Sequence, residues 1–238
     1  TLSLRMTGLR EDGLHLLDAE MVTVDLCDTL HLVEGEPGLT VVGGGPDIPT
    51  GPENLVNRAL VLAGRVASVT LTKRIPSRAG LGGGSSDAGA ILRWAGVDDL
   101  ASAALIGADV AFCTVGGRAR VTGVGEMVQP LPFIAKTFTL VTPPVPCPTS
   151  TVYRRWDELG GPRGRSGNDL EPAALSVSPE LARWRDELAE ATGMTPRLAG
   201  SGSTWFVEGD YPGDDRVVVR TVPSDSETSD HPLPAADC

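Results

Sequence analysis

The hydrophobic and polar positions of the chain follow two periods, and each period predicts a kind of element. Alternation with a period of two, together with β-branched residues, predicts strands, and apolar residues at helical spacing predict helices. The strands are expected over residues 2–7, 16–26, 28–33, 69–73, 110–115, 118–122, 126–131, 136–142, 195–198, 203–207 and 216–222. The helices are expected over residues 53–65, 87–94, 98–106, 149–159, 170–175 and 179–191.

The order of these elements indicates the fold class. Strands and helices mix without a regular βαβ repeat, which favours an α+β fold over a doubly wound parallel sheet. The pattern changes near residue 135, so we expect one domain over residues 1–134 and a second over residues 135–222. The last residues, 223–238, have no periodicity and carry acidic residues without Lys or Arg, which predicts a disordered acidic tail.

Composition narrows the classes of function. The 238 residues include 20 Lys plus Arg and 31 Asp plus Glu, which gives a formal net charge of −11. Such a chain is a poor partner for nucleic acid or a membrane surface, so a bound phosphate has to be held by backbone N–H groups and a few cations. No apolar run approaches the roughly 18 residues that cross a bilayer, and no signal peptide is visible. Four cysteines without a CxxC pair and three separated histidines argue for reduced thiols in a cytoplasmic protein and against a zinc site.

The strongest chemical signal is a glycine-rich stretch between a predicted strand and a predicted helix. Four glycines in five positions, at 80 and 82–84, allow backbone conformations closed to other residues. We expect Ser85 or Ser86 to cap the following helix, whose N-terminus offers free N–H groups and the positive end of the dipole. The spacing fits neither GxxxxGK[ST] nor GxGxxG, since no Lys follows and Ser85 stands where the third glycine is required. The stretch therefore predicts a phosphate cradle, with a flexible loop that binds nothing as the alternative.

Two other features are candidates for the same site. A second run of small residues, 198–204, lies between predicted strands and is either a tight turn or a second wall of the phosphate site. Asp109 stands in an apolar stretch at a predicted helix-to-strand junction. Because a buried carboxylate is costly without a partner, Asp109 needs a cation or a reacting hydroxyl, unless it only caps a helix.

These segments together resemble the GHMP kinases, whose phosphate loop is a Pro-x3-Gly-Leu-Gly-Ser-Ser-like run before a helix. Further matching segments narrow the resemblance to the branch that phosphorylates a cytidine-diphosphate-linked alcohol in isoprenoid precursor synthesis. The matching segments lie in order over residues 1–207, at 7–15, 53–56, 76–86, 123–126 and 168–174.

The resemblance implies an α+β kinase with the two-domain GHMP kinase fold. Its N-terminal domain would be like domain 2 of ribosomal protein S5 and its C-terminal domain ferredoxin-like, with ATP and the small-molecule substrate in the cleft between them. The γ-phosphoryl of ATP would move to a hydroxyl of the alcohol, with Mg²⁺ bridging phosphate oxygens and Ser86 a candidate ligand. A cytoplasmic monomer or homodimer is implied. Another small-molecule kinase of the group and a catalytically impaired nucleotide-binding relative remain alternatives.

Carried over by position, the resemblance also implies individual roles. Asp109 would be the catalytic aspartate and would contact the substrate, His15 would hydrogen-bond the cytosine, and Val124 would lie beside the substrate. Asn54 and Lys73 would bind ATP on its adenine side. The residues that would wrap or close on the ATP phosphates are Pro76, Ser77, Arg78, Ala79, Gly80, Leu81, Gly82, Gly83, Gly84, Ser85, Ser86, Gly200, Ser201, Gly202 and Ser203.

The chain departs from the family pattern at several positions. The family has a Pro-Ala-Lys segment just upstream of the position of Thr1, with its lysine beside the catalytic aspartate, so we expect the natural protein to extend beyond Thr1. Leu14 and Ser166 replace aromatic residues that flank the cytosine, which predicts weaker stacking on the base. Ala111 replaces a proline, and residues 210–214 replace an expected helix.

Overall fold

The structure is a computed structural model that describes residues 1–44 and 48–224. Its strands are β1 (Ser3–Leu9), β2 (His15–Val22), β3 (Thr29–Glu34), β4 (Gly38–Gly43), β5 (Ala67–Lys73), β6 (Arg118–Gly123), β7 (Met127–Leu131), β8 (Thr137–Val141), β9 (Arg197–Leu198), β10 (Trp205–Glu208) and β11 (Arg216–Arg220). Its helices are α1 (Leu55–Leu62), α2 (Gly83–Ala95), α3 (Leu100–Ile106), α4 (Val110–Val115), α5 (Thr149–Glu158), α6 (Glu171–Val177) and α7 (Leu181–Thr192). None of the helices in these ranges is long and apolar enough to cross a membrane.

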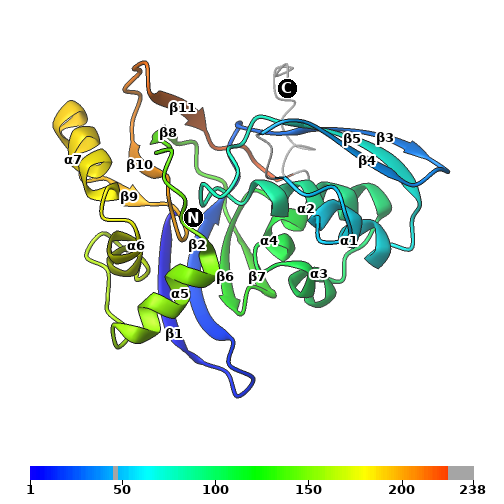
Figure 1. Cartoon of the computed structure of the whole chain (residues 1–238), viewed down its shortest axis with the longest axis horizontal. Coiled ribbons are helices and arrows are strands. Elements are labelled where there is room, and N and C mark those ends of the chain that lie inside the picture. The colour runs from blue at the N-terminus through cyan, green and yellow to red at the C-terminus, as the bar shows by residue number, and fades with distance from the viewer. Residues whose placement is uncertain (45–47, 225–238) are drawn as a thin grey trace.

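The first half of the chain forms layers in which helices α1 to α4 lie between two sheets (Figure 1). One sheet is antiparallel, with the order β1-β2-β6-β7. The other has the order β3-β5-β4, and its central strand pairs antiparallel with β3 and parallel with β4. The central strand alternates buried and exposed residues, as expected for a strand with one face on a core.

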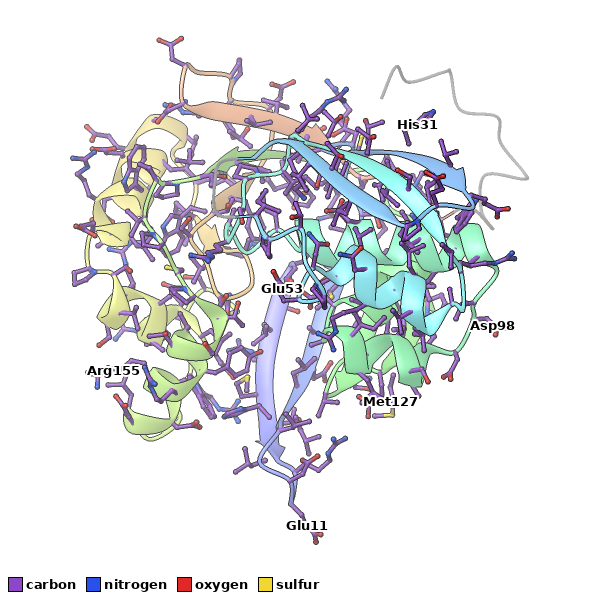
Figure 2. The ribbon with its side chains drawn as sticks, turned by 45° about the vertical axis from the view of Figure 1, so that its right-hand side comes forward. Glu11, His31, Glu53, Asp98, Met127 and Arg155 are labelled. Carbon is purple, nitrogen blue, oxygen red and sulfur yellow. The ribbon has the colours of Figure 1, made fainter. Side chains whose placement is uncertain are left out.

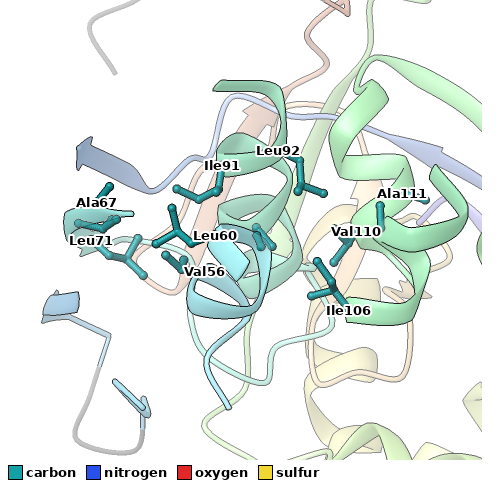
Figure 3. Close-up of a cluster of buried hydrophobic side chains, with 13 residues drawn as sticks. Val56, Leu60, Ala67, Leu71, Ile91, Leu92, Ile106, Val110 and Ala111 are labelled. Carbon is teal, nitrogen blue, oxygen red and sulfur yellow. The ribbon is translucent and has the colours of Figure 1, made fainter. Parts of the chain in front are cut away.

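One apolar cluster joins these layers and fixes the position of α2. Figure 3 shows Val56 of α1, Leu71 of β5, Ile91 of α2 and Val110 of α4 in this cluster, and each is at most 1% exposed. Full burial of such a side chain contributes about 1.5–3 kcal/mol. Packing against α1, α4 and β5 therefore holds α2, which follows the glycine-rich stretch, in one place.

The second half forms an antiparallel sheet with the order β11-β8-β10-β9. Helices α5 to α7 cover one face of this sheet, where Trp205 and Leu181 are fully buried. The other face, with Phe138 and Phe206, packs against apolar residues near the N-terminus and against Leu81 of the glycine-rich stretch. The two halves are thus in direct contact along the glycine-rich stretch (Figure 1).

Several predicted elements are wrong. Residues 110–115 form α4 and not a strand, because one side of this short helix packs on α2 and the other on the β2–β6 sheet, so its apolar residues show no helical period. The strand expected over 16–26 ends at Val22, and β4 was not predicted because glycines at both of its ends resemble a loop. The structure places no helix over residues 210–214, as the departure from the family pattern implied. The predicted acidic tail lies outside the described residues, apart from its first two.

Candidate active site

A cleft of about 460 Å³ lies between the two halves and brings together most of the predicted site residues. Glu53, labelled near the middle of Figure 2, belongs to its wall. The predicted residues that line the cleft are Asn54, Lys73, Pro76, Ser77, Arg78, Ala79, Gly80, Leu81, Gly82, Gly83, Gly84, Ser85, Asp109, Gly200 and Ser201. The predicted residues outside its lining are His15, Ser86, Val124, Gly202 and Ser203.

The start of α2 differs from the predicted one. The helix begins at Gly83, four positions earlier than expected, and its N-cap is Gly82, in the left-handed region with φ 68°. No side chain caps it, so the prediction that Ser85 or Ser86 is the cap is wrong. The hydroxyl of Ser86 instead donates to the carbonyl of Gly83 over 2.8 Å. The uncapped first turn therefore offers its backbone N–H groups and the positive end of the helix dipole to the cleft.

The two glycine segments meet in the cleft. Gly80 has φ 75°, and a Cβ on it would lie 2.3 Å from the carbonyl oxygen of Ala199 and 2.7 Å from that of Gly202. The N–H of Thr204 donates to the carbonyl of Ala79 over 3.1 Å. This contact brings Gly200 and Ser201 to the cleft as its second wall. Ser203 supports that wall from behind, since its buried hydroxyl donates to the carbonyl of Pro143 over 3.1 Å.

Asp109 lies beside the start of α2. It is the N-cap residue of α4, yet its side chain makes no capping hydrogen bond, which argues against a role in capping alone. A Cβ on Gly82 would lie 3.7 Å from its Oδ2. Burial raises the pKa of Asp109. The arrangement thus places a carboxylate next to the backbone groups best suited to hold phosphate.

The turn that carries Val124 packs against the residue before Asp109. A Cβ on Gly125 would lie 2.2 Å from the carbonyl oxygen of Ala108, so the close approach requires glycine. The N–H of Val124 donates to the carboxylate of Glu126 over 2.6 Å, which closes the turn. Val124 is therefore a near neighbour of the cleft without lining it.

His15 belongs to an aromatic cluster at one end of the cleft. Its Nε2 is hydrogen-bonded to Oδ1 of Asp157 over 2.8 Å. Its ring makes edge contacts with Tyr153 and Trp156, at centroid distances of 5.1 and 5.8 Å. Tyr153 lines the cleft, so it connects His15 to the site. Tyr153 was not predicted as a site residue.

A buried ion cluster behind the glycine-rich stretch was also not predicted. The ammonium group of Lys73 donates to Oδ2 of Asp28 and, over 2.8 Å, to Oδ2 of Asp87. Burial raises the pKa of Asp87 to about 6, although the bond with Lys73 acts in the opposite direction. The only sequence signal for Asp28 is that it is a charged residue at the start of the strand predicted over residues 28–33.

Asn168 and Asp169 tie separate parts of the site together. The side-chain amide of Asn168 donates to the carbonyl of Gly200 over 2.7 Å, which holds the second glycine segment. Asp169 pairs with Arg5 over 2.6 Å and accepts the N–H of Met6 over 3.0 Å, which attaches β1 to the second half. Both residues belong to a segment that resembles the family, but no role was predicted for either of them.

Comparisons with known proteins agree with this geometry. No protein-family model matches the chain. The structure is similar to the crystal structure of 4-(cytidine 5'-diphospho)-2C-methyl-D-erythritol kinase, with a TM-score of 0.72 and 30% identity over 92% of this chain and 95% of that chain. It shares its fold with the homoserine kinase from Cytophaga hutchinsonii, with a TM-score of 0.54 and 18% identity over 93% of this chain and 89% of that chain. The fold is therefore that of a GHMP kinase.

Curated relatives define the family more closely. The 4-diphosphocytidyl-2-C-methyl-D-erythritol kinase of Paracoccus denitrificans is 35% identical over 226 residues, which cover 86% of this chain and 82% of the relative. The kinase of the same name from Cereibacter sphaeroides reaches 37% over 236 residues, which cover 86% of this chain and 84% of the relative. The chain belongs to the 4-diphosphocytidyl-2-C-methyl-D-erythritol kinase family, which confirms the resemblance found in the sequence.

Proposed function

We propose that the protein transfers the γ-phosphoryl group of ATP to the 2-hydroxyl of 4-diphosphocytidyl-2-C-methyl-D-erythritol, in the non-mevalonate route to isoprenoid precursors. One observation carries the proposal: the carboxylate of Asp109 lies beside the uncapped N-terminus of α2 in a cleft with two glycine walls. The names of the relatives supply the identity of the alcohol. We also propose a cytoplasmic monomer or homodimer with a domain boundary near residue 135.

The phosphates of ATP are held mainly by backbone groups. The first-turn N–H groups of α2, Gly200 and Ser201 face the same cleft, and Gly202 and Ser203 hold this wall in place. Arg78 adds a cation, since it lines the cleft and has no hydrogen bond or ion pair with the described residues. Its backbone has φ 57°, which is uncommon for a residue other than glycine. A guanidinium group suits phosphate because it donates two parallel hydrogen bonds.

The adenine side lies beyond the phosphate loop. Pro49, Leu55 and Leu71 give this part of the cleft an apolar lining. Asn54 also lines it, and its amide donates to the carbonyl of Pro49 over 2.7 Å while its oxygen accepts the N–H of Val56 over 2.9 Å. Asn54 thus shapes this wall, and Lys73 lies at its junction with the phosphate loop.

The cleft also fits a magnesium ion that arrives with the nucleotide. Asp87 and Asp109 line it with carboxylate oxygens, the donors that Mg²⁺ prefers, and Oδ1 of Asp87 is buried without a partner among the described residues. No group of three metal-ligating side chains occurs in the described ranges, so phosphate and water would supply most ligands. Ser86 stays a candidate ligand. When bound, the ion neutralises charge on the phosphates.

Positioning and charge neutralisation account for most of the expected catalysis. Asp109 orients the substrate hydroxyl and takes its proton as the oxygen attacks the γ-phosphorus. The bond between this phosphorus and the bridging oxygen breaks, and ADP leaves with the electron pair. The cytosine would lie near His15 and Val124, where Tyr153 is the aromatic residue that lines the cleft while Leu14 and Ser166 are not aromatic.

The test follows ADP release from ATP, Mg²⁺ and the proposed alcohol, with the full-length natural protein. We expect release that depends on the alcohol and is abolished by Asp109→Asn. Asp98→Asn is the matched control, since Asp98 is exposed on the outer side of the molecule (Figure 2). ATP binding without alcohol-dependent ADP release would contradict the substrate assignment. A panel of other small alcohols would then separate a different kinase from a catalytically impaired relative.

A further inference from the structure

Three charged side chains are buried directly behind the phosphate loop, and one of them, Asp28, has no role in the proposed transfer. The side chains of Asp28, Lys73 and Asp87 are 1%, 5% and 4% exposed. Removing such charges from water costs several kcal/mol per ion, and the pairing often does no more than offset this cost. Stability is therefore a weak reason for the cluster, and a role in fixing local geometry explains it better.

Asp28 holds the chain where it enters the phosphate loop. Its Oδ1 accepts the N–H of Arg74 over 2.5 Å and the N–H of Ile75 over 2.9 Å. Its Oδ2 accepts from the ammonium group of Lys73. These three donors belong to the last residues before Pro76, so one carboxylate fixes the direction in which the loop leaves β5.

Lys73 extends the same cluster to the other end of the loop. Its ammonium group also donates to Asp87 of α2 over 2.8 Å. A Cβ on Gly83 would lie 2.9 Å from Cγ2 of Ile75 and 3.3 Å from Nζ of Lys73, so the first residue of α2 packs on the cluster. The end of β5 and the start of α2 are therefore held together at the two ends of the loop.

We infer that Asp28 is a positioning residue for the phosphates of the nucleotide, which acts through Lys73 and the backbone of residues 74 and 75. It sets the spacing between β5 and α2, and this spacing aims the N–H groups of the loop at the phosphates. The inference rests on the proposed binding of ATP. Asp87 contributes less than Asp28 to the positioning of the loop, because only one of its oxygens is bonded and an asparagine in its place could still accept from Lys73.

The first test compares the KM for ATP with the KM for the alcohol in Asp28→Asn. A displaced loop should raise the KM for ATP about 10- to 100-fold and leave the KM for the alcohol within about twofold. Asp87→Asn should have a clearly smaller effect. Asp18→Asn is the matched control, since Asp18 forms an ion pair with Arg120 outside the cleft and should change neither KM. The KM for ATP of the double variant Asp28→Asn/Lys73→Gln should rise no further than that of the more impaired single variant, because the two residues act as a unit.

A second readout does not depend on turnover. Arg78 is exposed within the loop, so trypsin cleavage after Arg78, followed by mass spectrometry, reports how well the loop is held. In Asp28→Asn cleavage should be faster, and ADP should protect the loop only at higher concentration than in the wild type. If Asp28→Asn does not fold, Lys73→Gln breaks the cluster from the other side and is assessed in the same way.

The outcomes separate this inference from the proposed function. An unchanged KM for ATP with unchanged cleavage would overturn the positioning role. If the KM values for ATP and for the alcohol rise equally and the melting temperature falls, the cluster only supports the fold. That result would also overturn the positioning role. If the wild type phosphorylates no alcohol, the proposed function fails, while ADP affinity and cleavage after Arg78 still decide the role of Asp28.

Discussion

The two ends of the cleft, which we propose for the phosphates and for the base and call the phosphate end and the base end, are built in different ways. At the phosphate end, glycine backbone and a buried ion cluster hold the loop, and most of the groups involved lie within residues 73–87. At the base end, His15 of β2 meets Asp157, which is 142 positions away and half exposed. The first end is fixed before a ligand arrives, because its geometry is set by backbone contacts and buried charge. The second end depends on how α5 packs against β2, so its specificity can change with few substitutions.

The largest loss of activity should come from substitution of Asp109, which lies where the two ends of the cleft meet. Asp109→Asn keeps the shape of the side chain but removes the carboxylate that orients the hydroxyl and takes its proton. We expect kcat to fall about 10²- to 10⁴-fold. The affinity for ADP, measured by calorimetry, should stay within about twofold because the phosphate end is intact. A variant that retains most of its kcat would show that Asp109 is not the catalytic carboxylate.

The next effect tests the rigidity of the phosphate end. Gly80→Ala would place a Cβ 2.3 Å from the carbonyl oxygen of Ala199, at a residue with φ 75°. The two glycine walls would have to separate, and we expect the affinity for ADP to fall by about tenfold or more. Gly13→Ala is the control, since Gly13 has φ 86° but no heavy atom within 4 Å of the added Cβ. Equal binding by both variants would contradict the need for close contact between the walls.

The ion cluster gives a pH-dependent effect on stability. Burial raises the pKa of Asp87 above its ordinary value, to about 6. A raised pKa means that the folded state favours the protonated form. The contribution of Asp87 to the free energy of unfolding is therefore full below about pH 4 and is lost as the pH rises through about 6.

Denaturation of the wild type and of Asp87→Asn at several pH values measures this contribution. The free energy of unfolding of the wild type, relative to that of the variant, should fall by about 1–3 kcal/mol between pH 4 and pH 7. A difference that stays constant over this range would show that the carboxyl of Asp87 has an ordinary pKa.

The smallest effect should come from the base end. His15→Ala removes one hydrogen-bonding group and two edge contacts, with Tyr153 and Trp156. A loss of about 1 kcal/mol should raise the KM for the alcohol about fivefold and leave the KM for ATP unchanged. His31→Ala, at an exposed position on β3 (Figure 2), is the control. If the KM for ATP rises and the KM for the alcohol does not, His15 does not contact the base of the alcohol.

The same contrast explains what could be predicted from the sequence. The glycine-rich stretch is local, so it was recognisable as a candidate phosphate cradle, and the structure brings the second glycine segment into contact with it. The start of α2 was misplaced because glycines have low helix propensity, and packing of Ile91 and Leu92 overrides that preference. The strand predicted over 110–115 was wrong because α4 is too short and too evenly buried to show a period.

Residues whose partners are far away in the sequence leave no local pattern from which their roles could be predicted. Asp28 reaches Lys73 across 45 positions, and Asp169 reaches Arg5 across 164. Their partners become neighbours only after the sheets form, so neither role follows from spacing. Tyr153 was overlooked for the same reason, because its importance comes from contact with His15 on another element.

The central claim is that this cleft moves phosphate from ATP to the 2-hydroxyl of the cytidine-linked alcohol. The most direct measurement is ³¹P NMR of the reaction of full-length natural protein with ATP, Mg²⁺ and 4-diphosphocytidyl-2-C-methyl-D-erythritol. The account predicts a new phosphomonoester signal that grows in step with ADP and is absent with Asp109→Asn. ADP formed together with inorganic phosphate, and no phosphomonoester, would contradict it.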